Sequence, residues 1–267
     1  MRASRVPEAA APPTVIEALL RRERLLYLAG PMVAAALAWL WLVPAALDMY
    51  GAMSGLSLWM MEASWGLRYG LLIFLMWAVM MIAMMLPSLA SALLLYGGIC
   101  RSDPRGGSAV LRVYAFATGY MGAWLAFSAV ATLLQWLLSE QGLLNRMMEL
   151  SDARLGGVAL ILAGLFQWTP FKQGCLSRCR SPAAFISEHW RRGVRGGATL
   201  GFHYGLFCLG CCWALMLVLF VCGVMNLTYI VLLSVFVLLE KATPWGVIAA
   251  KLIGTVLIAG GLYRLAS

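Results

Sequence analysis

The sequence predicts an all-α membrane protein, a polytopic bundle of about seven transmembrane helices with a cytoplasmic N-terminus. Of the 267 residues, 63% are hydrophobic and only 12% are charged, whereas soluble domains have about 45–50% apolar and about 25% charged residues. A water-soluble globule of this size cannot hide so much apolar surface. The same composition excludes a disordered chain and a secreted disulfide scaffold. The net charge of +9 comes from short basic clusters between apolar runs, the pattern of membrane proteins rather than of nucleic-acid-binding domains.

Seven apolar segments are candidates for spanning helices, which need roughly 20 residues. The fourth and sixth are short, so we expect them to be tilted or partly re-entrant. We expect residues 1–24 to form a loose, basic cytoplasmic tail and residues 25–265 to form a single transmembrane domain. The seven segments lie at about 25–47, 70–96, 113–138, 155–171, 198–222, 226–240 and 245–264.

The basic residues set the expected orientation. Most of the 20 Lys and Arg residues lie in the N-terminal tail, between the second and third segments, or between the fourth and fifth. The positive-inside rule places these regions in the cytoplasm and the C-terminus outside. Arg21 and Arg22 precede the first apolar run, as in a signal peptide, but that run is longer than a signal core. A retained anchor is therefore favoured over a cleaved signal.

Sulfur dominates the chemistry that the spans offer, with 16 Met and seven Cys against two His. Thioethers and thiolates suit Cu(I), whereas Mg, Ca and Mn prefer oxygen ligands. The second segment has the densest run of methionines, and several of them share one face of a helix. Adaptable core packing explains such a stripe equally well. The candidate thioether ligands here are Met80, Met81, Met84 and Met85, beside Met76, and Pro87 one turn later can free a backbone carbonyl.

Three cysteines in the fifth segment follow the spacing i, i+3, i+4 and therefore share one helix face. Gly197, Gly201 and Gly205 project onto the same face and allow another helix to approach closely. We therefore expect the thiols to face the bundle interior, either as metal or redox groups or as inert buried cysteines. His203 joins them only if the helix is deformed, since it points about 140° away at 100° per residue. The candidate ligands are Cys208, Cys211 and Cys212, with Met216 one turn further and His203 as an outlying member.

Two further cysteines, Cys175 and Cys179, lie in the basic region after the fourth segment and fall on one side if that region is helical. Lys172, Arg178 and Arg180 are expected to lower their pKa and favour thiolate. An ordinary basic loop with two incidental cysteines is the alternative. Separately, ionisable groups at membrane depth are usually paired, and we expect Glu240, next to Lys241, to pair with Lys251 across a tight hairpin.

Several separated motifs together resemble the bacterial family of predicted metal-binding integral membrane proteins, over about residues 70–260. The resemblance implies that these sulfur, Glu and Lys residues are the motif positions of the family, some of whose members carry the label copper chaperone. The remaining motif positions are Trp77, Pro87, Gln167, Lys172, Trp213 and Asn226, which accompany the cysteines, methionines, Glu240 and Lys241 named above.

The favoured function is binding and transfer of a soft metal, Cu(I), in the inner membrane of a bacterium. The sequence contains no phosphate-binding glycine loop, so we expect no nucleotide cofactor. Expected partners are membrane lipid and a protein or membrane complex that donates or accepts copper, and we expect no nucleic acid. Two alternatives remain: an intramembrane oxidoreductase that uses copper or thiols, and a structural or assembly subunit of a membrane complex.

Overall fold

The computed structural model describes residues 15–51, 65–103, 106–145 and 147–266, and for residues 15–22 the backbone alone. The described residues form α-helices and short connections, with one isolated β-bridge between Leu144 and Leu150. The all-α prediction is confirmed. The helices are α1 (Val15–Met49), α3 (Leu67–Ser102), α4 (Ala109–Glu140), α5 (Ala153–Trp168), α6 (Pro170–Arg180), α7 (Pro182–Glu188), α8 (Gly193–Cys222), α9 (Leu227–Ala242) and α10 (Gly246–Ala266).

Five helices in the described residues, rather than the seven predicted, are long and apolar enough to cross a membrane, which makes a multi-pass membrane protein. The fourth and sixth predicted segments are α5 and α9, of 16 residues each. At about 1.5 Å per residue each is about 24 Å long, short of a hydrocarbon core of about 30 Å. The prediction for the tail also changes, because α1 already begins at Val15, inside the expected segment 1–24; residues 1–14 lie outside the described ones.

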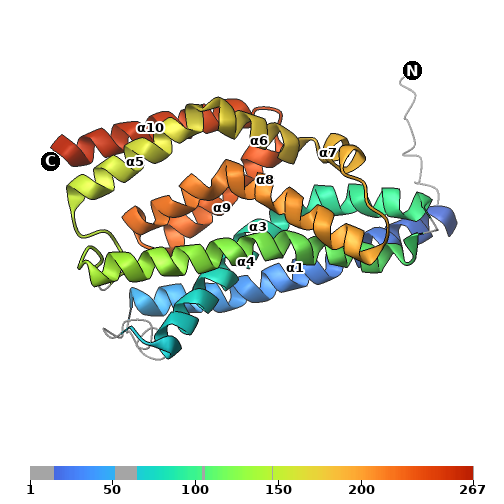
Figure 1. Cartoon of the computed structure of the whole chain (residues 1–267), viewed down its shortest axis with the longest axis horizontal. Helices are drawn as coiled ribbons and strands as arrows, with labels where there is room; N and C mark the ends of the chain where they lie inside the picture. The colour runs from blue at the N-terminus through green and yellow to red at the C-terminus, as the bar shows by residue number, and fades with distance from the viewer. Residues whose placement is uncertain (1–14, 52–64, 104–105, 146, 267) are drawn as a thin grey trace, which may run out of the picture.

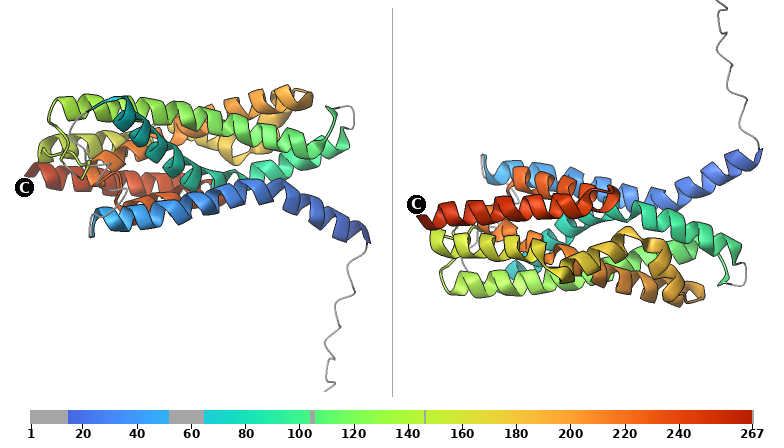
Figure 2. Two further views of the ribbon diagram at one scale, coloured as in Figure 1. Left: turned by 90° about the horizontal axis from the view of Figure 1, so that it is seen from below. Right: turned by 90° about the horizontal axis from the view of Figure 1, so that it is seen from above.

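The long helices run roughly parallel to one axis of the bundle, and the first turn of α1 and the last turn of α10 lie at opposite ends (Figure 1). Two further views show that α1 bends along its length (Figure 2). Near this bend the Tyr114 hydroxyl of α4 inserts between a backbone amide and a backbone carbonyl of α1. It accepts a hydrogen bond from the Gly30 amide at 3.1 Å and donates one to the Leu26 carbonyl at 3.0 Å. Pro31 follows directly and lacks an amide hydrogen, which favours bending.

Glycines let α4 and α8 pack with their backbones almost in contact. A Cβ at Gly201 would collide with the Phe116 carbonyl oxygen, and one at Gly205 would lie 2.8 Å from the Cβ of Ala123. On α4, a Cβ at Gly119 would collide with the Ala198 carbonyl. This confirms the predicted small-residue face of α8 and identifies α4 as the helix that approaches it. The cysteines on α8 are thereby held inside the bundle.

Pro87 leaves one backbone carbonyl of α3 without its helical donor, as the sequence predicts. A proline has no amide hydrogen, so the carbonyl four residues earlier, that of Ala83, loses its partner. The indole nitrogen of Trp39 on α1 donates a hydrogen bond to this oxygen at 3.0 Å. The break in α3 is therefore satisfied by a neighbouring helix, which fixes α1 against the methionine-rich part of α3.

Ion pairs join several helices at the end of the bundle where α3 ends and α4 and α8 begin. Arg101 of α3 pairs with Glu23 of α1 at 2.9 Å. Asp103 pairs with the wholly buried Arg112 at 3.5 Å and with Arg192 at 3.6 Å. Three of the basic residues that the sequence assigns to one side of the membrane, Arg101, Arg112 and Arg192, thus gather at one end of the molecule.

Candidate functional site

The three cysteines of α8 are wholly buried and lie close together. The sulfur atoms of Cys211 and Cys212 are 3.2 Å apart, and the Cys211 thiol donates a hydrogen bond to the Cys208 carbonyl oxygen at 3.0 Å. The i, i+3, i+4 spacing and the close contact with α4 produce this arrangement, because they turn all three side chains inward. The predicted interior position is confirmed.

A fourth thiol reaches the same place from α6. Cys179 is buried, and its thiol interacts with those of Cys208 and Cys211. Its backbone is held from α8, since the Tyr204 hydroxyl donates a hydrogen bond to the Cys179 carbonyl oxygen at 2.7 Å. We call Cys179, Cys208, Cys211 and Cys212 the four-thiol cluster. The sequence suggested two separate groups of cysteines, and the structure brings members of both together.

Cys208 has two polar neighbours besides the other thiols. The Lys241 ammonium of α9 donates hydrogen bonds to the Cys208 sulfur at 2.8 Å and to the Ser88 hydroxyl of α3 at 3.0 Å. The Tyr120 hydroxyl of α4 lies 2.9 Å from the same sulfur. A cation beside a cysteine sulfur favours the thiolate, which is the form that binds metals. Cys208 is thus the member of the cluster best prepared to act as a ligand.

The methionine run of α3 lies antiparallel to α8. The rings of Trp77 and Phe220 are 5.2 Å apart, and eleven residues further along α3 the Lys241 ammonium bridges Ser88 and Cys208. From Trp77 to Ser88, α3 advances by 11 residues, and from Phe220 back to Cys208, α8 covers 12 residues in the opposite direction. Residues at equal distances from Ser88 and from Cys208 therefore lie at the same level along the bundle.

This register places methionines at the level of the four-thiol cluster. Met85 and Cys211 are each three residues from the bridging contact, and Met84 and Cys212 are each four residues from it. All four side chains are buried, with exposed fractions of at most 2%. Met80 and Met81 follow one turn further, at about the level of Met216, and all three are also buried. The methionine face therefore continues from the cluster toward the end of the bundle where α8 ends.

A buried ion pair lies next to this region, but it differs from the predicted one. Glu240 pairs with Lys172 of α6 at 2.6 Å, and the Lys172 ammonium also donates to the Gln167 side-chain oxygen of α5. All three side chains are wholly buried. The predicted partner, Lys251, instead lies 5.6 Å above the ring of Trp168. Glu240 turns toward α6 because that helix packs across α8 and α9, an arrangement that the sequence did not indicate.

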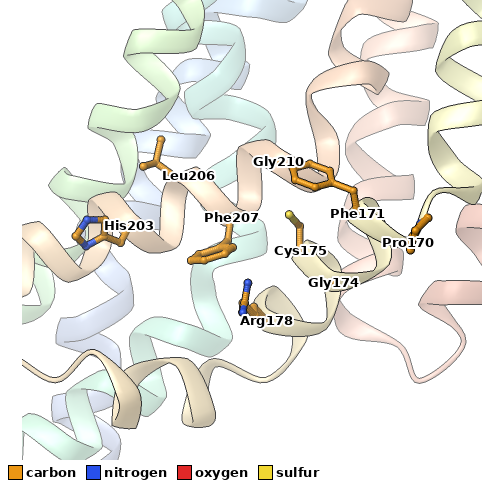
Figure 3. A pocket seen from close by; sticks show the side chains of 9 residues that line it. All are labelled: Pro170, Phe171, Gly174, Cys175, Arg178, His203, Leu206, Phe207 and Gly210. Atoms are coloured by element: carbon orange, nitrogen blue, oxygen red, sulfur yellow. The ribbon is translucent and has the colours of Figure 1, made fainter.

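Cys175 lies one turn from Cys179 on the same buried face of α6, as the spacing predicts. Its sulfur lies 3.0 Å from the position of a Cβ at Gly210, so this glycine makes room for the thiol. It lines a pocket of about 440 Å³ with Phe171, Arg178 and His203 (Figure 3). The prediction that basic neighbours lower the pKa of this thiol is wrong for Cys175. Burial raises the pKa of the Cys175 thiol, and the nearby Arg178 offsets only part of this effect.

The two histidines do not join the four-thiol cluster. His203 is half-buried at the far side of this pocket, and its ring points away from Cys175 (Figure 3). This agrees with the angle expected for a regular helix. His189, after α7, is exposed and stacks on Phe185 with ring centres 4.7 Å apart. Among the described residues, no three or more His, Cys, Asp or Glu side chains are arranged to hold a metal ion.

The remaining motif residues have structural contacts. The Trp77 indole donates a hydrogen bond to the side-chain oxygen of Gln135 at 2.8 Å. The Asn226 side chain caps α9 by accepting from the Thr228 amide at 3.1 Å. Trp213 is partly exposed and packs edge-on against Phe166 of α5, with ring centres 5.2 Å apart.

A comparison with protein families identifies the chain. The model of the PpoB2 copper chaperone family matches residues 74–263, most of the chain and all of the four-thiol cluster. The chain belongs to the PpoB2 copper chaperone family. The match excludes all of α1, and the resemblance seen in the sequence also begins after that helix. Neither the curated proteins nor the solved structures include a match to this copper chaperone family member.

Sequence reasoning missed three contributors to the site. Tyr120 neighbours Cys208, Ser88 accepts a hydrogen bond from Lys241, and Tyr204 holds the Cys179 backbone; the three residues come from three different helices. Tyr120 and Tyr204 stand among many aromatic residues and carry no distinguishing spacing. Ser88 follows Pro87 directly at the end of the methionine run, and that position was the one available signal.

Proposed function

We propose that this chain carries Cu(I) within the membrane, holding it at the four-thiol cluster and passing it on by exchange of sulfur ligands, without a nucleotide. The approach of Cys179 from α6 to Cys208 and Cys211 on α8 is the observation that carries the proposal. Membership of a copper chaperone family supports copper as the cargo. The donor set agrees with this cargo, because thiolates and thioethers select Cu(I) among the common biological metals.

Charge balance supports the same assignment. A Cu(I) ion held by two thiolates carries one net negative charge, which is costly in a membrane interior. The Lys241 ammonium, 2.8 Å from the Cys208 sulfur, offsets that charge. The neighbouring Glu240 is already paired with Lys172, so Lys241 stays available for the cluster. We therefore infer that Lys241 stabilises the copper-bound form.

The path of the ion follows from the positions of the sulfur atoms. Cys175, in the pocket at α6, is the proposed point of exchange with a copper-donating or copper-accepting protein. Cys179 lies one helical turn further, within the cluster. Met84 and Met85 lie level with the cluster, and the weaker thioether sites continue through Met80, Met81 and Met216. Each step replaces one sulfur ligand by another, so no single step leaves the ion without a ligand.

The resting arrangement of the thiols fits a carrier. The thiols hydrogen-bond to one another and to a backbone carbonyl, and copper binding replaces these hydrogen bonds with metal–sulfur bonds. A site that is assembled only when the ion arrives also releases it more readily than a rigid tetrahedral site.

The test is to measure bound metal in protein purified without oxygen and loaded with Cu(I). The site variant replaces Cys208, Cys211 and Cys212 with Ser. The control variant replaces Cys100 and Cys222 with Ser, since these cysteines lie outside the cluster. The proposal predicts near-stoichiometric copper in the wild type and the control, and loss of most of it in the site variant. Equal copper in all three proteins, or none in the wild type, would contradict it.

A further inference from the structure

Three separate segments of the chain meet at the end of the bundle where α4 and α8 end. The last turn of α1, the link between α4 and α5 and the link between α8 and α9 all lie there (Figure 1). Each segment contributes a methionine followed directly by a polar residue, and none of these methionines belongs to the sulfur path proposed above. The pairs are Met49 and Tyr50, Met148 and Glu149, and Met225 and Asn226.

The three polar residues surround Gly223, which follows the last residue of α8. The Tyr50 hydroxyl donates a hydrogen bond to Oε1 of Glu149 at 3.2 Å. A Cβ at Gly223 would lie 2.6 Å from that hydroxyl, 2.7 Å from Oε1 of Glu149 and 3.2 Å from the Cβ of Asn226. Only glycine fits here, and its φ of 94° is also one that other residues rarely adopt. The contact around Gly223 therefore draws the backbones of the three segments together.

The three methionines lie on the inner side of this contact. Met49 and Met225 have no exposed surface and Met148 is 4% exposed, whereas Tyr50 is 44% exposed. Consecutive Cα atoms are about 3.8 Å apart, so each methionine begins one residue away from the contact around Gly223. A methionine side chain is unbranched and has three rotatable bonds. The three thioethers can therefore reach a common point beneath the polar residues.

The backbone of Met148 is held in an unusual conformation. Its φ of 58° lies in the left-handed region, and among the described residues no other non-glycine residue has a positive φ. The Asn145 side chain maintains this loop, because its oxygen accepts hydrogen bonds from the Met147 amide at 2.8 Å and the Glu149 amide at 3.0 Å. A strained residue that its surroundings hold in place is a candidate functional residue.

This end of the bundle continues the methionine face of α3. The Leu150 amide, two residues after Met148, donates a hydrogen bond to the Phe220 carbonyl oxygen at 2.8 Å. The Phe220 ring lies 5.2 Å from that of Trp77, and the wholly buried Met76 directly precedes Trp77. Met76 is the methionine of α3 farthest along the chain from Ser88. It is therefore level with the loop that carries Met148.

We propose that Met49, Met148 and Met225 form a second Cu(I) site, made of thioethers alone, beyond the methionine face of α3. Thioethers are soft ligands that suit Cu(I). A thioether has no proton to lose, so the ion enters and leaves this site without proton release. Glu149 adds a carboxylate to the rim, which favours a cation. The role of this site as the end of a copper path rests on the proposed function, whereas its binding of a soft ion does not.

The test uses the full chain, purified in detergent without oxygen, with its methionine methyl groups labelled with carbon-13 for NMR. Silver(I) is the probe, because it binds thioethers as Cu(I) does and keeps one oxidation state. Substitution of each methionine with Leu, which nearly conserves side-chain volume, assigns its signal. Met32 and Met121 are the matched controls, since both are partly buried and lie elsewhere in α1 and α4. The titration is repeated in the variant that replaces Cys208, Cys211 and Cys212 with Ser.

The methyl signals of Met49, Met148 and Met225 should shift together along one saturation curve, in the wild type and in the cysteine variant. The signals of Met32 and Met121 should stay in place, and Met148→Leu should weaken the silver affinity of the other two site residues. No shift of the three signals, separate saturation curves, or equal shifts of all methionines would overturn the proposal. The wild-type titration decides this even if Met148→Leu does not fold. If the thiols bind no silver but the three signals still shift, this proposal stands and the proposed function fails.

Discussion

The Lys241 ammonium of α9 donates a hydrogen bond to the Cys208 sulfur of α8 at 2.8 Å, inside the helix bundle. The same ammonium holds the Ser88 hydroxyl of α3 at 3.0 Å. One charged group thus links the thiols of α8 to the end of the methionine run of α3. Three helices that are far apart in the sequence meet at this point, and the proposed copper path passes through it.

Replacing Lys241 with Gln should weaken Cu(I) binding by about 10- to 100-fold. The change removes a charge-assisted hydrogen bond to Cys208, worth about 1.5–3 kcal/mol, and leaves the copper–thiolate centre without a compensating charge. Competition with a coloured Cu(I) chelator measures the affinity, and circular dichroism checks the helix content. Lys251→Gln is the matched control, because Lys251 lies over the Trp168 ring rather than at the cluster. Equal weakening in both variants would show that Lys241 has no specific role.

Replacing Glu240 with Gln should destabilise the protein by about 3–5 kcal/mol, because it leaves the wholly buried Lys172 ammonium without its counter-ion. Thermal unfolding in detergent measures the loss. The double variant Lys172→Met with Glu240→Met should recover most of the stability, since it removes both charges from the interior. If the double variant is as unstable as Glu240→Gln, the pair contributes through packing rather than charge.

Replacing Gly201 with Ala should destabilise the contact between α4 and α8 by about 1–3 kcal/mol, the cost typical of overpacking. The new methyl group would meet the Phe116 carbonyl oxygen, which belongs to the backbone and cannot rotate away. Gly174→Ala is the control, because nothing lies within 4 Å of a Cβ at that position of α6. It should stabilise α6 by about 0.5–1 kcal/mol. Unfolding of both variants is followed by circular dichroism in the same detergent. A Gly201→Ala protein as stable as the wild type would contradict the close contact between α4 and α8.

Alkylation of Cys175 should be slow at neutral pH and should still accelerate above pH 9. Burial raises the pKa of this thiol above its ordinary value of 9.0, so the reactive thiolate accumulates only in more alkaline solution. Between pH 7 and pH 8 the rate should rise about tenfold, as for any thiol well below its pKa. Peptide mapping by mass spectrometry after timed labelling gives the rate for this residue alone. A rate that levels off below pH 8 would contradict the effect of burial.

The sequence predicts the features of this protein that depend on one helix at a time. The spacing of Cys208, Cys211 and Cys212 correctly places their thiols in the interior, and Gly201 and its neighbours correctly predict a close helix contact. Pro87 correctly predicts a freed carbonyl. In each case the period of a helix and local backbone chemistry are sufficient.

The remaining features depend on how α6 folds back on the bundle, which no local pattern encodes. This packing brings Cys179 to the α8 thiols and pairs Lys172 with Glu240, so the predicted partner Lys251 is displaced. It also buries Cys175 and reverses the expected effect of its basic neighbours. The segments of α5 and α9 were correctly expected to be short, and each helix has 16 residues, but apolar composition alone did not show that they fall short of a full membrane span.

The central claim, that sulfur atoms from α6 and α8 bind one Cu(I) ion, is tested most directly by X-ray absorption spectroscopy of the copper-loaded protein. A first coordination shell of sulfur alone is expected in the wild type. Cys179→Ser should remove one of these sulfur neighbours, whereas the control Cys222→Ser should leave the spectrum unchanged. A shell of nitrogen or oxygen, or a spectrum that Cys179→Ser does not alter, would contradict the account.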